Sequence, residues 1–242
     1  MEALKLLTGK KYIYLVDRGN TAIKLALEII NKPITLIQDQ GGWLTYKQYP
    51  KNTNELKTKL GVVDLEDLNQ KADKDSALLI NSLSGYVFPQ PMKEIEKICK
   101  ENNCPIINDA SGSIGTAIAK VGDIVIASFG KWKPINLEYG GCIASDTPLE
   151  IEETFNKEKI LELKTIIKDL PERLKKLKQL VQKTKQDLKD FKILNKKDGL
   201  VVLTEKNNEI IKYCENNNLE YTLCPRYIRI NKEAISIEIK RK

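Results

Sequence analysis

Short apolar runs separated by segments of helical periodicity constrain the fold of this chain most. The runs cover residues 12–16, 34–37, 77–82, 105–107 and 121–129. Between them, residues 22–30 and 92–102 repeat apolar side chains at the period of an α-helix. A strand, a helix and a further strand in this order favour parallel pairing through right-handed crossovers. The sequence therefore predicts an α/β fold with a mainly parallel sheet flanked by helices.

The composition changes after residue 145, where long charged helices are expected over 149–169 and 171–192. Pro171 falls at a first-turn position, which indicates a boundary between these two helices. A polar linker at 195–199 leads into a small α+β unit, with strands expected at 200–203, 221–223 and 227–239 and a helix at 208–216. We therefore predict a large domain over residues 1–150, connecting charged helices over 151–194 and a small C-terminal domain over 195–242.

The composition excludes several functional classes. The chain contains no histidine, so neither a Ser-His-Asp triad nor a histidine metal site can form. Five cysteines without a Cys-x-x-Cys pair or another metal-binding pattern indicate reduced, buried thiols, and no metal is expected. No run of about 18 apolar residues occurs, and the first residues lack the apolar stretch of a signal peptide. We expect a cytoplasmic protein without a membrane partner.

A net charge of +7 raises the question of nucleic-acid binding. Much of the excess lies between residues 157 and 197, where leucines recur at helical spacing and lysines fill the other face. No aromatic residues interleave with this basic face, and no nucleic-acid-binding motif occurs. We interpret it as a solvated helix face and expect no nucleic-acid partner.

The stretch from residue 104 to residue 142 contains the candidate catalytic groups. Asp109 follows the apolar run 105–107, and Lys133 follows the run 121–129. Open α/β sheets hold ligands at the carboxyl ends of their strands, so these two side chains can meet in one crevice. Pyridoxal phosphate requires such a pair, because its aldehyde forms a Schiff base with an amine and its ring nitrogen pairs with an acid. Lys131 is an alternative amine, and Asp109 could instead be only a turn residue.

A tight turn after the run 12–16 offers a phosphate site. Residues 17–21 precede an apolar helix, and a helix start exposes backbone N–H groups that bind phosphate. Gly19 permits close approach of the backbone, while Asn20 and Thr21 carry side chains that can donate hydrogen bonds. An ordinary helix N-cap is the alternative interpretation.

The order and spacing of these residues resemble the fold-type I pyridoxal-phosphate enzymes, and among them the DegT/DnrJ/EryC1/StrS aminotransferase family. In that family, as in this chain, one strand ends in Asp-Ala, a second ends in Ser-Phe, and a lysine comes five residues after the serine and seven before a Gly-Gly pair. The corresponding residues here are Asp109-Ala110, Ser128-Phe129, Lys133 and Gly140-Gly141. The family also has a Gly-Thr-Ala turn where this chain has its tight turn before the first long helix.

The resemblance implies that residues 1–150 bind pyridoxal 5'-phosphate. Lys133 would form the Schiff base, and Asp109 would pair with the pyridine nitrogen. Trp43 would stack on the face of the ring, although a tryptophan of the core or of an interface is equally consistent with the sequence. The phosphate would be held by Gly19, Asn20, Thr21 and Ser128.

Two further expectations come from the same resemblance. Arg229 lies in an aromatic-x-Arg-x pattern that would grip a substrate carboxylate, with Arg226 as the alternative. A homodimer is expected, because fold-type I sites are built at a subunit interface. The chain departs from the family at Gly112 and Ile114, where the family usually has a Gln and a His.

The function that the resemblance implies is an aminotransferase acting on an amino acid or an amino-sugar-type small-molecule substrate. Because the chain has no histidine, one lysine amine would do both the acid and the base work. The alternatives are a pyridoxal-phosphate-dependent lyase or desulfurase on the same fold, and a non-catalytic binding protein that retains the fold.

Overall fold

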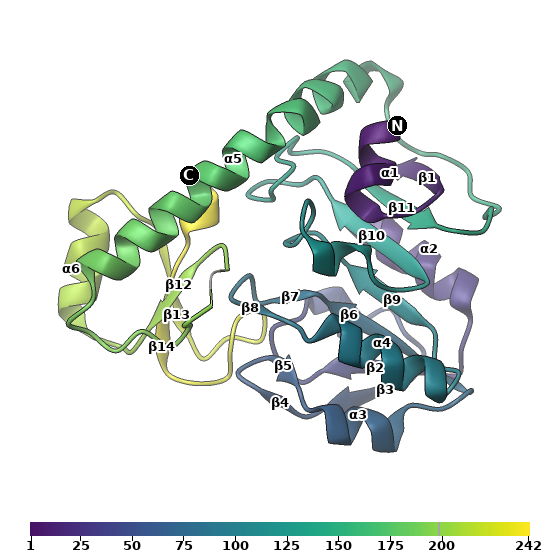
Figure 1. The fold of residues 1–242 in the computed structure, drawn as a ribbon, viewed down its shortest axis with the longest axis horizontal. Coiled ribbons are helices and arrows are strands. Elements are labelled where there is room, and N and C mark those ends of the chain that lie inside the picture. Colours follow the sequence, from purple (N-terminus) through teal and green to yellow (C-terminus); the bar gives the residue numbers. More distant parts are fainter. Residues whose placement is uncertain (198) are drawn as a thin grey trace.

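A seven-stranded sheet forms the centre of the protein in the computed structural model, which describes residues 1–197 and 199–242 (Figure 1). The expected linker at 195–199 includes residue 198, which lies outside the described residues. In spatial order the strands are β1 (Tyr12–Val16), β11 (Gly141–Ser145), β10 (Ile124–Ser128), β9 (Ile106–Asp109), β6 (Ser76–Asn81), β2 (Ile34–Gln38) and β3 (Thr53–Leu56). Only β11 runs antiparallel to its neighbours in this sheet. The predicted mainly parallel sheet is therefore confirmed, although β3 and β11 were not expected from the sequence.

Helices cover both faces of this sheet. Successive residues of a strand point to opposite faces, so Leu78 and Ile80 of β6 pack against α3 (Leu65–Lys71) and α4 (Met92–Glu101). Leu79, between them, packs on the other face with residues of α2 (Gly19–Ile30). Burial on both faces explains why these strands are continuous apolar runs and do not alternate with polar residues. A short helix, α1 (Glu2–Thr8), precedes the sheet.

Shorter elements lie between these strands and helices along the chain. They are η1 (Leu44–Lys47), β4 (Thr58–Lys59), β5 (Val62–Val63), β7 (Leu83–Ser84), β8 (Phe88–Pro89) and η2 (Ala117–Lys120). The Asp64 carboxylate accepts hydrogen bonds from the N–H groups of Glu66 and Asp67 and so caps α3.

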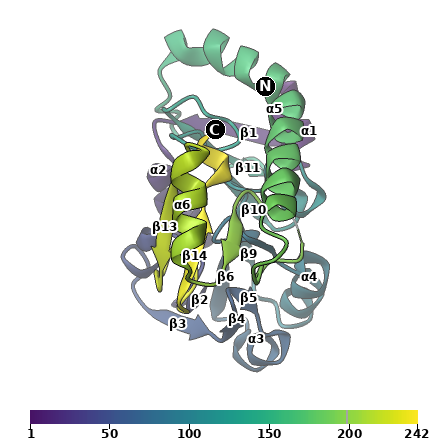
Figure 2. The same cartoon turned by 90° about the vertical axis from the view of Figure 1, so that its left-hand side faces the viewer.

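A single long helix, α5 (Ile160–Asp187), follows η3 (Lys157–Lys159) and replaces the two helices predicted from the sequence. The predicted boundary at Pro171 is wrong, because Pro171 lies inside α5. Proline cannot donate to the carbonyl of residue 167, which bends a helix but need not end it when both halves are packed. Leu163 and Leu170 pack on the large domain, whereas Leu177 and Val181 pack on the C-terminal part. Figure 2 shows the resulting bend.

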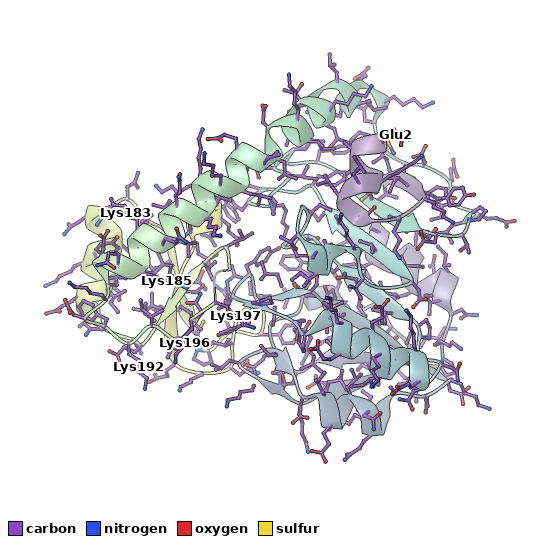
Figure 3. All side chains as sticks on the ribbon, in the orientation of Figure 1. Glu2, Lys183, Lys185, Lys192, Lys196 and Lys197 are labelled. Carbon is purple, nitrogen blue, oxygen red and sulfur yellow. The ribbon has the colours of Figure 1, made fainter. Side chains whose placement is uncertain are left out.

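The lysine-rich part of the chain lies at the far end of this helix. Figure 3 shows its labelled lysines around the end of α5 and the loop that follows: Lys183, Lys185, Lys192, Lys196 and Lys197. Among the described residues, no helix is both long enough and apolar enough to cross a membrane.

The C-terminal part is a small antiparallel sheet with one helix and a short final turn, and it lies beside the carboxyl ends of the large sheet (Figure 1). Its elements are β12 (Val202–Thr204), α6 (Asn208–Asn216), β13 (Tyr221–Cys224), β14 (Ala234–Ile237) and η4 (Ile239–Arg241). The strand expected over 227–239 is wrong in its first half. Arg229 lies there in a turn, where its N–H donates to the carbonyl of Arg226 at 2.8 Å.

Candidate active site

A pocket of about 510 Å³ lies where the carboxyl ends of the large sheet face the C-terminal unit. Most of the residues predicted for the site line it, although they come from six different segments of the chain. These residues are Gly19, Asn20, Trp43, Asp109, Ser128, Lys133 and Arg229. The fold thus brings together groups up to about 200 residues apart along the chain.

Asp109 ends β9 and is almost fully buried, with 5% of its surface exposed. Its Oδ2 accepts a hydrogen bond of 2.6 Å from the hydroxyl of Tyr46, and its Oδ1 accepts one of 2.9 Å from the N–H of Ser111. Burial and then the Asp109 charge raise the pKa of Tyr46 well above its ordinary value, so this hydroxyl stays a proton donor. Both carboxylate oxygens are therefore fixed, and the acid is oriented by its neighbours.

Tyr46 was not identified from the sequence. The signal that could have found it is the departure at Gly112 and Ile114, which leaves Asp109 without the polar neighbours that the family usually supplies. A Cβ atom at Gly112 would lie 2.9 Å from the ring of Tyr86. The space beside Gly112 is thus occupied by the Tyr86 ring, and the Asp109 carboxylate takes a donor from η1.

Lys133 projects from the loop after β10 into the pocket. The turn before it places Trp132 at a φ of 65°, and the N–H of Trp132 donates to Asn136 Oδ1 at 2.5 Å. The Lys133 amine donates to the hydroxyl of Tyr86, and it lies 5.1 Å from the ring centre of Trp43. Lys131 is exposed, and its amine lies 5.1 Å from the ring centre of Trp132. Of the two amines, Lys133 is the one held between the aromatic residues of the pocket.

The start of α2 forms one corner of the pocket. A Cβ atom at Gly19 would lie 2.5 Å from Cβ of Ser128, so only glycine fits where the helix start meets β10. The first N–H groups of a helix have no intrahelical acceptor, and Gly19 and Asn20 at the start of α2 line this corner together with Ser128. Trp43 donates from Nε1 to Asn20 Oδ1 at 3.0 Å, which links the tryptophan to the same corner.

Thr21 differs from the expectation. Its hydroxyl donates to Asp17 Oδ1 at 2.6 Å, and its side chain does not line the pocket. The predicted contact of Thr21 with a phosphate stays a prediction, and in this structure the hydroxyl is held by the turn that precedes α2. Its backbone N–H remains part of the helix start.

Arg229 lies in the wall that the C-terminal unit contributes, but it already binds a carboxylate of the protein. Its Nε and Nη2 donate to Glu238 at 2.9 and 2.6 Å, and its Nη1 donates to the carbonyl of Ile228 at 2.8 Å. Burial alone would raise the pKa of Glu238, but the charge and hydrogen bonds of Arg229, with Lys240 and Arg241, lower it to about 2. The guanidinium of Arg229 is thus already paired with a charged carboxylate of the protein, which does not support the expected binding of a substrate carboxylate.

Lys240 and Arg241 also line this wall and were missed by the sequence analysis. They belong to η4, and their side chains approach Tyr86 and Trp132 of the large domain. No local motif marks them, because they reach the pocket only through the packing of the two parts of the chain.

Residues 55–166 match the DegT/DnrJ/EryC1/StrS aminotransferase family model. This segment contains Asp109, Ser128, Lys133 and the Gly140-Gly141 pair, so the resemblance drawn from their spacing is confirmed.

Shorter segments match two well-characterised proteins. A segment of 82 residues is 37% identical to UDP-4-amino-4,6-dideoxy-N-acetyl-beta-L-altrosamine transaminase of Campylobacter jejuni, and covers 32% of this chain and 21% of that protein. A segment of 83 residues is 39% identical to the mitochondrial cysteine desulfurase of Arabidopsis thaliana, and covers 33% of this chain and 16% of that protein. The matched segments thus span about a fifth or less of the length of these relatives.

The whole chain also matches solved structures at low sequence identity. The crystal structure of NtdA from Bacillus subtilis with bound cofactor PMP superposes with a TM-score of 0.71, covers 98% of this chain and 71% of NtdA, and is 13% identical. At this identity the likeness shows a shared fold.

Proposed function

We propose that this chain is a pyridoxal-phosphate-dependent aminotransferase that acts through Lys133. The observation that carries the proposal is the placement of three groups around one pocket. They are the Lys133 amine, the buried Asp109 carboxylate and the helix start at Gly19. An amine, an acid and a phosphate cup are the groups that this cofactor requires.

The residues of the pocket fit pyridoxal 5'-phosphate. The glycine at position 19 leaves the α2 N–H groups open to a phosphate, with Asn20 and the Ser128 hydroxyl beside them. Asp109 would hold the proton on the pyridine nitrogen, and Trp43 would lie against the ring. The bound PMP of NtdA supports the same cofactor, since PMP and pyridoxal phosphate are its amine and aldehyde forms.

When bound, the cofactor takes an amine at its aldehyde carbon and draws electrons from the substrate carbon into its ring. Lys133 would hold the cofactor until a substrate amine displaces it, and its freed amine would then move the proton that leaves the substrate carbon. The Tyr86 hydroxyl orients this amine, while Tyr46 and the Ser111 N–H keep Asp109 aimed at the pocket. With no histidine in the chain, Lys133 would serve as both base and acid.

The test is borohydride reduction of the protein after addition of pyridoxal phosphate, followed by peptide mapping. We expect one label on Lys133, and no label at that peptide in Lys133→Met. Lys131→Met is the matched control and should label like the wild type. A label on Lys131, or one scattered over exposed lysines, would show that the assignment is wrong.

A lyase or desulfurase is the second candidate, and the segment shared with the Arabidopsis cysteine desulfurase favours it. The same lysine and acid would serve either reaction, because both begin by weakening a bond at the same substrate carbon. A panel of amino acids separates them: a transaminase converts the bound cofactor to its amine form, whereas a lyase or desulfurase leaves it unchanged and releases pyruvate or sulfide. A protein that acquires no visible absorption with pyridoxal phosphate would be the non-catalytic alternative.

We further propose that the substrate is an amino acid or an amino-sugar-type molecule, which the name of the Campylobacter transaminase supports. A homodimer would complete the pocket, and sedimentation at micromolar concentration tests it, with a monomer counting against the proposal. The five cysteines are free in the described structure, which supports a reducing compartment such as the cytoplasm.

A further inference from the structure

Lys240 is a buried cation that faces the pocket. Only 4% of its surface is exposed, yet it is one of the residues that line the pocket. Its amine lies 4.7 Å from the ring centre of Tyr86 and 5.6 Å from that of Trp132. Its nearest charged partner is Glu238 Oε2 at 3.5 Å, which is beyond the usual length of a charged hydrogen bond. Within residues 1–197 and 199–242, no acceptor is recorded within hydrogen-bond distance of this amine, which therefore keeps donors to offer.

The charge around Lys240 is unbalanced. Glu238 is shared by Arg229 at 2.6 Å, by Lys240 at 3.5 Å and by Arg241 at 3.8 Å. Arg241 has a second partner in Glu220, whose side chain is 57% exposed. One buried carboxylate thus faces three cations, and Arg229 takes both of its oxygens. Buried cations without a matching anion are costly, so an anion that enters the pocket gains by meeting Lys240.

We propose that Lys240, supported by Arg241, forms an anion subsite in the pocket wall and binds a carboxylate or phosphate group of the substrate. That the bound anion is a substrate rests on the proposed function, but anion binding at this subsite needs no cofactor. Trp132 closes the subsite from the large domain, since the guanidinium of Arg241 lies 4.2 Å from its ring centre. Arg229 then holds Glu238 in place next to Lys240.

The protonation of Lys240 offers an independent readout. Burial lowers its pKa to about 7, against the attraction of Glu238 and with the repulsion of Arg229, Lys133 and Arg241. An anion prefers the charged amine, so binding takes up a proton when the pH lies above the pKa of the free site. Affinity for an anion should therefore fall about tenfold per pH unit as the pH rises above 7.

The experiment uses the full chain in a Trp43→Phe background, which leaves Trp132 as the one tryptophan of the sequence. Its fluorescence is titrated with succinate, which cannot form an imine, and separately with phenyl phosphate. We expect Lys240→Met to weaken the dissociation constant of the better anion at least tenfold. Lys131→Met is the matched control, because it removes an exposed cation from the same ring, and it should change the constant less than threefold.

A pH series tests whether the charge of Lys240 itself binds the anion, which a loss of affinity in the variant alone does not. In the wild type the affinity should fall from pH 7 to pH 8.5, and in Lys240→Met it should be flat. Lys133 and Tyr86 also face Lys240, but both remain in the variant, so any pH dependence of theirs would persist there. Tighter binding of succinate identifies a carboxylate subsite, and tighter binding of phenyl phosphate a phosphate subsite.

Equal affinities in the wild type and Lys240→Met would overturn the proposal, and so would a flat pH profile in the wild type, which needs no variant to fold. The cofactor is left out of these titrations, and its binding is followed separately by visible absorption. Anion binding through Lys240 without cofactor binding would refute the aminotransferase but keep the subsite, and the converse result would refute the subsite alone.

Discussion

The two walls of the pocket are built on different principles. The large-domain wall places its polar groups at strand ends and at a helix start, where the backbone positions Asp109, Ser128 and Gly19. The C-terminal wall holds Arg229, Glu238 and Lys240 by their mutual charges, nine-tenths or more buried. In the first wall the buried carboxylate of Asp109 is held by neutral donors, whereas the second wall has buried ions of opposite charge that depend on one another.

Substitutions in the two walls should therefore differ in whether they change the stability of the fold or the activity of the site. Lys133 and Ser128 of the large-domain wall can be changed without leaving an unpaired buried charge, so the loss of either should affect binding or turnover. Neither Arg229 nor Glu238 of the C-terminal wall can be removed without leaving a buried charge unpaired, so the loss of either should affect folding first.

Lys133→Met should have the largest effect, on turnover alone. The amine is the proposed Schiff-base and proton-transfer group, so we expect at least about a 10³-fold loss of the amino-acid half-reaction. The free energy of unfolding should change by no more than about 1 kcal/mol. Stopped-flow absorption with an amino-acid panel and urea unfolding measure the two quantities. A large loss of stability would break the contrast between the walls.

Glu238→Gln should act in the opposite way. Removing this buried carboxylate leaves Arg229, Lys240 and Arg241 without their shared anion, which we expect to cost about 3–5 kcal/mol in urea unfolding. Glu233→Gln in the same unit is the control, because the Glu233 side chain is 74% exposed and should matter by less than about 0.5 kcal/mol. If both variants unfold alike, the ion cluster does not hold this wall.

The free energy of unfolding of the wild type and of Glu238→Gln should depend differently on pH. The pKa of Glu238 is lowered from 4.5 to about 2 in the fold, so its contribution is complete above pH 4.5 and is lost as the pH falls toward 2. The wild type should therefore lose stability over this range, whereas Glu238→Gln should lose less of it.

Lys240→Met tests whether a residue of the C-terminal wall is kept for stability or for binding. The fold lowers the pKa of Lys240 from 10.5 to about 7, so between these pH values the unfolded chain binds more protons than the native one. Below pH 7 the native amine is charged as well, and its buried charge lowers the free energy of unfolding. The variant should be more stable than the wild type, and by of the order of 2 kcal/mol more at pH 6 than at pH 9. Urea midpoints at the two pH values measure this, and a destabilised variant at pH 6 would make Lys240 a structural residue.

Tyr46→Phe should have the smallest effect. It removes the 2.6 Å hydrogen bond to Asp109 and leaves a buried oxygen unpaired, at a cost of about 1–2 kcal/mol in unfolding. The visible spectrum with pyridoxal phosphate should shift as well, because Asp109 would then be less firmly aimed at the ring nitrogen. Tyr49→Phe, on an exposed tyrosine near the same segment, should change neither quantity.

Part of the site could be predicted from the sequence because its signals are local. Asp109 follows the apolar run 105–107, Ser128 lies in the run 121–129, Gly19 lies in the turn before the first apolar helix, and the loop after 121–129 carries Lys133. Each of these positions follows from where one strand or helix stops, which residue types along a few positions largely decide. Pro171 was misread for the converse reason, since a proline ends an isolated helix but only bends one whose two halves are both packed.

The sequence by itself determined the order of strands and helices, and with it the strand end that carries the acid and the loop that carries the amine. Only the tertiary structure decided the partners of these groups: Tyr46 for Asp109, Tyr86 for Lys133, and Glu238 in place of a substrate for Arg229. Local order depends on neighbours along the chain, whereas the partner of a buried polar group is whichever donor or acceptor the packed fold brings within about 3 Å, because burial leaves it no water. Lys240, which lies 107 positions after Lys133, reached the pocket by that packing alone.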